Sequence, residues 1–353
     1  MKYLKYSLTY LFPALAYLAI MFGGWLTILT VVVAFGVIPL IEFFWKGTSE
    51  NNSQLEEEAR RQSGFFYDLL LHGMVLVQWG LVVSLGWRIA EGGFSYIELV
   101  GCVFSVGICN GTFGINIAHE LGHRTDRWSH FSAKCLLLSS LYMHFFIEHN
   151  RGHHRNVATT NDPATSRRGE TVYGFWLRSI PQSWLSAWRL EHHKLGRKNL
   201  KNLSWHNEMI RFTLIQIATV LLIGLAGGWL AAVGFVSAAV IGILLLESVN
   251  YIEHYGLQRD RNPNGRFERV SPHHSWNSNH PIGRALLFEL SRHSDHHANP
   301  TRPYYVLRHF DESPQLPTGY PGMILVALLP PAWFRMMDPH VDREINRRIA
   351  LTA

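Results

Sequence analysis

Six apolar segments, each long enough to cross a bilayer, constrain this chain more than any other feature of its sequence. A transmembrane helix needs roughly 20 mostly apolar residues. The first segment follows a short charged start, but its apolar run is long and a second segment follows almost at once, so we interpret it as a span and not as a signal peptide. The predicted spans are residues 4–22, 25–45, 65–87, 96–118, 212–230 and 232–250.

The placement of charge agrees with a membrane protein. Charged residues make up 16% of the chain, against roughly 25% in soluble domains. No Lys or Arg lies in the second to sixth predicted spans, and with a cytoplasmic amino terminus Arg88 is the only basic residue in the external turns. Basic loops collect on the cytoplasmic side, so the two large polar regions, 119–211 and 251–353, are expected to be cytoplasmic.

The predicted fold class is therefore an all-α integral membrane protein. One membrane-embedded domain is expected over residues 1–353, with six transmembrane helices and a helical cytoplasmic cap. An apolar stretch of about twelve residues from Met323 is too short to span and is expected to be an interfacial anchor. The net charge of +6 needs no nucleic-acid partner, because topology alone demands basic loops on one side.

Nine of the twenty histidines fall into four tight groups within the polar regions. Imidazole is the commonest metal ligand and binds in its neutral form. The groups are His119 and His123 in HELGH; His149, His153 and His154 in HNRGHH; His254 in NYIEHYG; and His293, His296 and His297 in HSDHH. Nine ligands are too many for one ion, so the sequence indicates more than one metal.

Helical spacing indicates how the ligands divide. His119 and His123 are one turn apart on one helix face, so both can hold one ion. His149 and His153 are expected to repeat that arrangement, with His154 rotated by about 100° toward a second ion. In HSDHH, His293 and His297 form a similar pair, with His296 free to serve the other metal. The paired endings of two groups predict a binuclear site.

Acidic residues lie beside every histidine group. Metal-bound imidazoles usually donate their other N–H to such a group. The candidates for this supporting role are Glu120, Glu148, Asp162, Glu253 and Asp295. The alternative is that these acids only solubilise a cytoplasmic cap.

Two other classes of protein share part of this pattern. HELGH matches the HExxH helix of zinc proteases, but a catalytic zinc takes only three protein ligands, which leaves most of the histidines unexplained. A histidine-rich metal transporter would place ligands within the spans, near the membrane midplane. The nine histidines instead lie beyond the ends of the spans.

The motifs HELGHR, EHNRGHH, NYIEHYGL and RHSDHHANP together resemble those of the membrane-bound alkane 1-monooxygenases (alkane omega-hydroxylases), in the wider histidine-rich desaturase and hydroxylase superfamily. The resemblance covers nearly the whole chain. It implies a non-haem di-iron site, two Fe ions held by the nine histidines named above. The implied reaction is hydroxylation of the terminal methyl group of medium-chain linear alkanes to primary alcohols with O2.

The resemblance also implies partners and a location. Electrons would come from rubredoxin and an upstream NAD(P)H-dependent rubredoxin reductase, and the chain itself has no GxGxxG loop, no flavin or haem motif and too few cysteines for an iron-sulfur centre. The enzyme would lie in the bacterial inner membrane with its active site on the cytoplasmic side. A fatty-acyl desaturase or another hydroxylase of the superfamily is the alternative.

Physical chemistry favours the same reaction. An alkane offers no charge, hydrogen-bonding group or leaving group, so oxygen activation by a redox metal is the remaining route. The substrate would enter from the bilayer. In the family, side-chain bulk on the second span limits the length of the alkane, and Gly36 is the residue of this span expected to line the substrate tunnel.

Overall fold

The computed structural model describes residues 4–352, and in this range the chain is helical, with two isolated β-bridges and no sheet. Five helices in it are long and apolar enough to cross a membrane, which confirms the predicted fold class of an all-α integral membrane protein. They are Leu4–Phe22, Gly24–Phe44, Gly64–Glu91, Tyr96–Gly122 and Glu208–His254.

Within these segments the helical geometry changes locally. The first contains α1 (Leu4–Ser7), η1 (Leu8–Tyr10) and α2 (Leu11–Phe22), and the second contains η2 (Gly24–Ile28), α3 (Leu29–Val32), the π-helical turn η3 (Val33–Val37) and α4 (Ile38–Phe44). The third is α6 (Gly64–Glu91). The fourth runs through α7 (Tyr96–Cys109), the π-helical segment η4 (Asn110–Ile115) and α8 (Asn116–Gly122).

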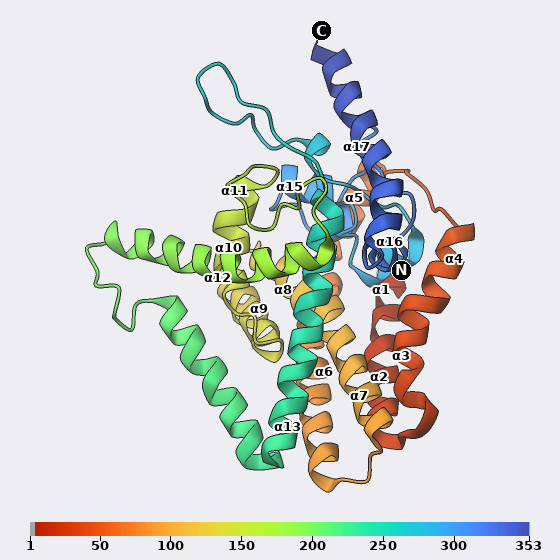
Figure 1. The fold of residues 1–353 in the computed structure, drawn as a ribbon, viewed down its shortest axis with the longest axis vertical. Helices are drawn as coiled ribbons and strands as arrows, with labels where there is room; N and C mark the ends of the chain where they lie inside the picture. The colour runs from red at the N-terminus through yellow and green to blue at the C-terminus, as the bar shows by residue number, and fades with distance from the viewer. Residues whose placement is uncertain (1–3, 353) are drawn as a thin grey trace.

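The helix α13 (Glu208–His254) explains why five helices stand where six spans are predicted. Gly228 interrupts it with a left-handed φ of 82° and ψ of 168°, a conformation that glycine adopts without a Cβ penalty. Figure 1 shows the first arm descending and the second arm turning back from its lower end. The two arms cover the predicted spans 212–230 and 232–250, so the predicted count of six corresponds to five helices, one of them folded.

Close packing of small residues joins the second arm of α13 to the fourth segment. A Cβ added at Gly242 would lie 2.6 Å from the Cβ of Asn110, and one added at Gly111 would lie 2.8 Å from the carbonyl oxygen of Gly242. Small residues permit such approaches between membrane helices. This contact fixes the relative height of the two helices, which carry His119 and His254 at their ends.

The remaining helices lie mostly at the end of the bundle where His119 and His254 lie, called here the histidine side (Figure 1). They are α5 (Gln54–Gln62), α9 (Arg127–Ser139), α10 (Phe145–Glu148), the π-helical turn η5 (His149–His153), α11 (His154–Asn156), α12 (Val172–Gly196), η6 (Pro272–His274), α14 (Pro281–Leu286), α15 (His293–Ala298), η7 (Tyr304–Val306), α16 (Tyr320–Ala327) and α17 (Pro330–Thr352).

A second apolar core lies within this cap. Met323 of α16 and Trp333 of α17 are fully buried in it, together with Tyr251 and Tyr255 at the end of α13. The stretch from Met323, predicted to be an interfacial anchor, thus packs partly against the end of a span, while its Leu325 and Leu329 stay exposed, at 37% and 63%. The interfacial anchor stays a prediction.

Candidate metal centre

The structure brings all nine clustered histidines together. They come from four separate segments: α8 and the residue after it, η5 with α11, the end of α13, and α15. Their ring nitrogens form two groups, and within each group the possible ligand atoms lie within 4.8 Å of one another. The first group is His119, His123, His149, His154 and His296, and the second is His153, His254, His293 and His297.

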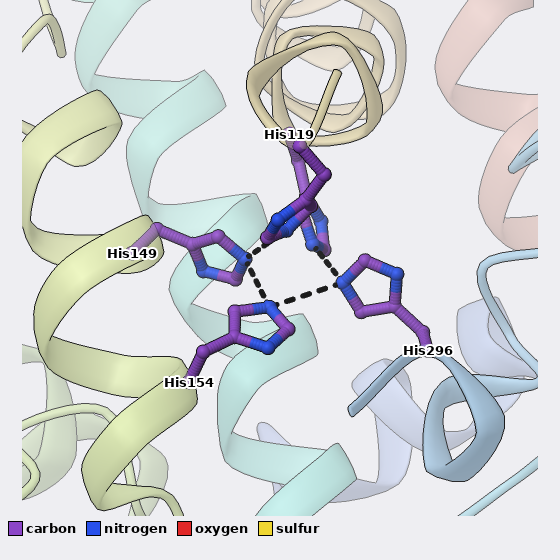
Figure 2. A group of neighbouring side chains, drawn as sticks. His119, His149, His154 and His296 are labelled. Atoms are coloured by element: carbon purple, nitrogen blue, oxygen red, sulfur yellow. Dashed lines mark hydrogen bonds between the residues drawn. The ribbon is translucent and has the colours of Figure 1, made fainter. Parts of the chain in front are cut away.

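In the first group the imidazoles point toward a common centre (Figure 2). The Nε2 atoms of His119 and His296 are 2.7 Å apart, and those of His149 and His154 are 2.9 Å apart. His154 and His296 link these two pairs with an Nε2 to Nε2 distance of 3.2 Å. His123 joins through its Nε2 at 3.2 Å from that of His149.

The second group is built in the same way and is more deeply buried. The Nε2 atom of His297 lies 2.8 Å from that of His293 and 3.2 Å from that of His153. His254 adds its Nε2 at 3.3 Å from that of His293. All four side chains are at most 4% exposed.

These distances fit nitrogens that share a metal ion. Two imidazole nitrogens bound at about 2.1 Å lie roughly 3.0 Å apart at right angles and about 3.4 Å apart at the tetrahedral angle. The Nε2 of His154 contacts the Nε2 atoms of both His149 and His296, yet a neutral imidazole nitrogen carries either one hydrogen or one lone pair. Lone pairs that converge on a cation satisfy such a cluster, so the donor set suits a transition metal.

Burial keeps most of these imidazoles available as ligands. It lowers the pKa of His149, His154, His296 and His297 well below the usual value for histidine, and neighbouring histidines lower it further. A neutral ring presents a lone pair, whereas a protonated ring cannot bind metal. These four imidazoles are therefore neutral donors at pH 7.

A π-helical turn decides how the HNRGHH segment is shared. The structure divides His153 and His154 between the two groups as predicted, but His149 joins His154 and not His153. In an α-helix His149 and His154 would be about 140° apart around the axis. The turn η5, with its i to i+5 bonding, widens the helix and brings the sixth residue back to the face of the first.

The other helical pairs lie as predicted. His119 and His123 share one group, and in α15 the pair His293 and His297 belongs to the second group while His296 belongs to the first. Histidines left out of the prediction stay outside both groups: His274 contacts Glu268, and His280 contacts Ser278.

Two of the five predicted supporting acids contact imidazoles. Asp162 Oδ2 lies 2.9 Å from Nδ1 of His153. Burial alone would lower the pKa of His153, but the neighbouring carboxylate raises this pKa above the usual value for histidine. Glu253 Oε2 lies 3.2 Å from Nε2 of His293, while Tyr320 donates to its Oε1 at 2.7 Å. Glu253 therefore stands at the edge of the second group, close enough to act as a further ligand.

Two other acids serve different partners. Glu120 pairs with Arg124 at 2.9 Å and accepts from the backbone of Tyr304, and Asp295 pairs with Arg302 at 2.7 Å. Engagement of Glu120 by a guanidinium also disagrees with the free general base of an HExxH protease. Glu148 is buried beside His149 and has an oxygen with no hydrogen-bond partner among the described residues.

An apolar cavity lies between the spans. Its lining includes Ala34, Phe35 and Ile38 from the second segment and also Glu253, which contacts His293 of the second group. Gly36 does not line it: this residue is exposed, and a Cβ there would meet only Val32, at 3.9 Å. On this span the residues that shape the cavity are therefore the neighbours of the predicted glycine.

Sequence comparisons place the chain among known proteins. The fatty acid desaturase family profile matches residues 94–326. The chain is 42% identical to alkane 1-monooxygenase 2 of Pseudomonas aeruginosa, over 89% of this chain and 83% of that protein. It is 41% identical to an alkane 1-monooxygenase of Pseudomonas putida, over 90% and 79% respectively. It is also 28% identical to the hydroxylase component of a xylene/toluene monooxygenase of Pseudomonas putida, over 83% and 78%.

Proposed function

This chain belongs to the fatty acid desaturase family and, within it, to the alkane 1-monooxygenases, and from that premise we propose that it hydroxylates the terminal methyl group of medium-chain linear alkanes to primary alcohols. The overall reaction consumes one alkane, O2, two electrons and two protons, and yields the alcohol and water.

One observation carries the proposal: a residue that lines the apolar cavity, Glu253, also contacts the histidine centre. Glu253 both lines the cavity and lies 3.2 Å from the Nε2 of His293. An alkane buried in the cavity gains roughly 0.8 kcal/mol per CH2 group, and its chain end would meet the second histidine group. Side chains of Phe12, Ile108 and Leu245 also line the cavity and give it apolar walls that suit an alkane chain.

The metal in this proposal is iron, with one ion in each histidine group. His119, His123, His149, His154 and His296 would hold the first ion, and His153, His254, His293 and His297 the second. When bound, the two irons would supply the activation of dioxygen that an unreactive C–H bond requires. The protein orients the ligand rings, and Asp162 fixes the tautomer of His153 through its Nδ1.

Glu253 has a positioning role on the substrate side. Its carboxyl group is held by Tyr320 and is 3% exposed. It therefore marks the boundary between the apolar cavity and the nitrogen ligands, and it restricts access of water to the chain end.

Electrons would come from rubredoxin, reduced by an NAD(P)H-dependent reductase. Exposed basic residues near the histidine side offer a docking surface for an acidic carrier; Arg197, Lys198 and Lys201 are exposed there. If docking is electrostatic, turnover at a fixed concentration of carrier falls steeply as salt is added. The proposed location is the bacterial inner membrane, with the histidine side facing the cytoplasm, in keeping with the positive-inside rule.

The test is product formation from octane with rubredoxin, its reductase and NADH, measured by gas chromatography together with the iron content of the protein. His254→Ala and His296→Ala, one from each group, are expected to abolish 1-octanol formation and to lower bound iron. His192→Ala is the matched control, because His192 is exposed, lies outside both groups and bonds to Asn202. Wild-type turnover by either ligand variant would refute the assignment, and desaturated products from acyl substrates in place of alcohols would identify a desaturase.

A further inference from the structure

The helix α12 lies across the ends of the spans instead of along them (Figure 1). Near its start, the ring of Phe175 packs 5.6 Å from that of Tyr251, and Ser179 donates to Glu247 at 2.6 Å. Near its end, Lys194 pairs with Glu208 at 2.7 Å. Because Glu247 lies in the second arm of α13 and Glu208 begins the first arm, α12 bridges the two arms on the histidine side.

The length of the two arms of α13 indicates the depth of α12 in the membrane. Gly228, where α13 folds back, is 20 residues after Glu208 and 19 residues before Glu247. At 1.5 Å per residue each arm measures about 30 Å, which equals the hydrocarbon thickness of a typical bilayer, roughly 30 Å. If the bend lies at one surface of the hydrocarbon core, α12 lies at the other, at the level of the lipid headgroups.

The sequence of α12 divides the helix into three faces. One face is buried against the protein and includes Phe175 and Ser179. A second is apolar but exposed, with Leu177 at 81%, Tyr173 at 44% and Trp184 at 43% exposure. A third is exposed and polar, with Gln182 and Arg189; Leu177 and Gln182 are about 140° apart around the axis.

We propose that α12 lies flat in the bilayer interface on the histidine side, with its apolar face, Tyr173, Leu177 and Trp184, against phospholipid acyl chains and its polar face in water. A protein partner for this face is disfavoured, because the first arm of α13, which begins beside α12, also exposes apolar side chains, such as Leu214 at 49% and Ile217 at 51% exposure. Aromatic rings and cations suit the interface and the phosphates. The exposed cations Arg189, Arg197 and Lys198 lie on or just after this helix.

This contact would also support the histidine centre. Glu191, which is buried near the end of α12, pairs with Arg151 of η5 at 3.1 Å, and α12 packs along α10, which leads into η5. An interfacial α12 therefore sets the height of the segment that carries His149, His153 and His154 relative to the membrane. The inference concerns the membrane surface and does not depend on the substrate.

The test is site-directed spin labelling of the full chain in nanodiscs of phosphatidylcholine and phosphatidylglycerol. Cys135→Ser removes the one partly exposed thiol, since Cys102 and Cys109 are fully buried. Nitroxides at Leu177→Cys and, as the matched control on the same helix, Gln182→Cys are compared by collision with lipid-soluble O2 and with a water-soluble nickel chelate. Both positions are exposed, so the label replaces no core contact.

We expect O2 collisions to dominate at position 177 and nickel collisions to dominate at position 182, with the same contrast between Trp184→Cys and Arg189→Cys. Dominant nickel collisions at positions 177 and 184 would overturn the proposal, because the apolar face would then lie in water. Protection of position 177 from both reagents would also overturn it, because protein would then cover that face.

Discussion

Side chains of the second segment are expected to set the longest alkane that the enzyme accepts, and Ala34 is the clearest place to test this. Ala34 is 7% exposed and lines the cavity that Glu253 also lines. Along the fourth segment the lining runs from Asn116 back to Ile108, eight residues or about 12 Å of helix. The substitution Ala34→Leu adds three carbon atoms to the wall of the cavity.

The magnitude follows from the area that the substrate loses. Each methylene excluded from the cavity costs about 0.8 kcal/mol. Three carbons displaced from the longest accepted alkane therefore cost about 2.4 kcal/mol, and with tenfold per 1.36 kcal/mol this lowers its kcat/KM by roughly 60-fold. An alkane three carbons shorter is expected to keep its kcat/KM.

The assay is competition in an equimolar series of linear alkanes, with the primary alcohols separated by gas chromatography and normalised to iron content. Val37→Phe is the matched control, because Val37 lies on the same helix but is 43% exposed toward lipid. An unchanged product profile for Ala34→Leu would refute the assignment of this cavity to the substrate. An equal shift in both variants would show that the helix moves as a whole.

Three further outcomes are expected. Gly242→Ala places a Cβ 2.6 Å from that of Asn110, so it should destabilise the folded protein by about 1–3 kcal/mol and lower its unfolding temperature in detergent. The control Gly80→Ala, whose Cβ meets nothing within 4 Å, should leave the unfolding temperature unchanged. Asp162→Asn should weaken metal affinity about 10–100-fold without unfolding the protein; undiminished iron retention against a chelator would contradict the role of its bond to His153. Burial lowers the pKa of His144 to about 4, so as the pH falls this histidine takes up its proton in the unfolded chain before it does so in the folded one. The unfolding temperature of metal-free protein should therefore fall as the pH drops from about 6.5 toward 4. A flat profile over that range would contradict the burial of neutral imidazoles.

Much of the fold was predictable because hydrophobic length and charge placement are properties of local sequence. The bend at Gly228 follows from adjacent apolar stretches joined by two glycines, Gly227 and Gly228. The structure differs from the prediction here only in that one folded helix stands in place of two separate spans. The burial of Met323 was not predictable, because a short apolar stretch fits a lipid surface and a protein core equally well. In the structure Met323 packs with Tyr251, whereas Leu325 and Leu329 of the same stretch are exposed.

At the candidate site, the prediction from local sequence is only partly correct. The α-helical period separates His153 from His154 correctly but pairs His149 with the wrong neighbour, because no residue in HNRGHH signals a π-helical turn. The wrong choice of Gly36 as a tunnel residue has a similar cause. The span itself is assigned correctly, but which of its side chains face the cavity depends on packing against the fourth segment and on the turn η3. Long-range packing decides both, and a single sequence does not specify it.

The two adjacent pairs, His153 with His154 and His296 with His297, have a mechanical consequence. In each pair, neighbouring residues reach different groups, so the groups are tied together on two sides by single peptide units with Cα atoms about 3.8 Å apart. Tilting of the spans in membranes of different thickness would therefore carry both groups as one body. The distance between the two groups is therefore set by covalent geometry and does not depend on the lipid in which the protein is placed.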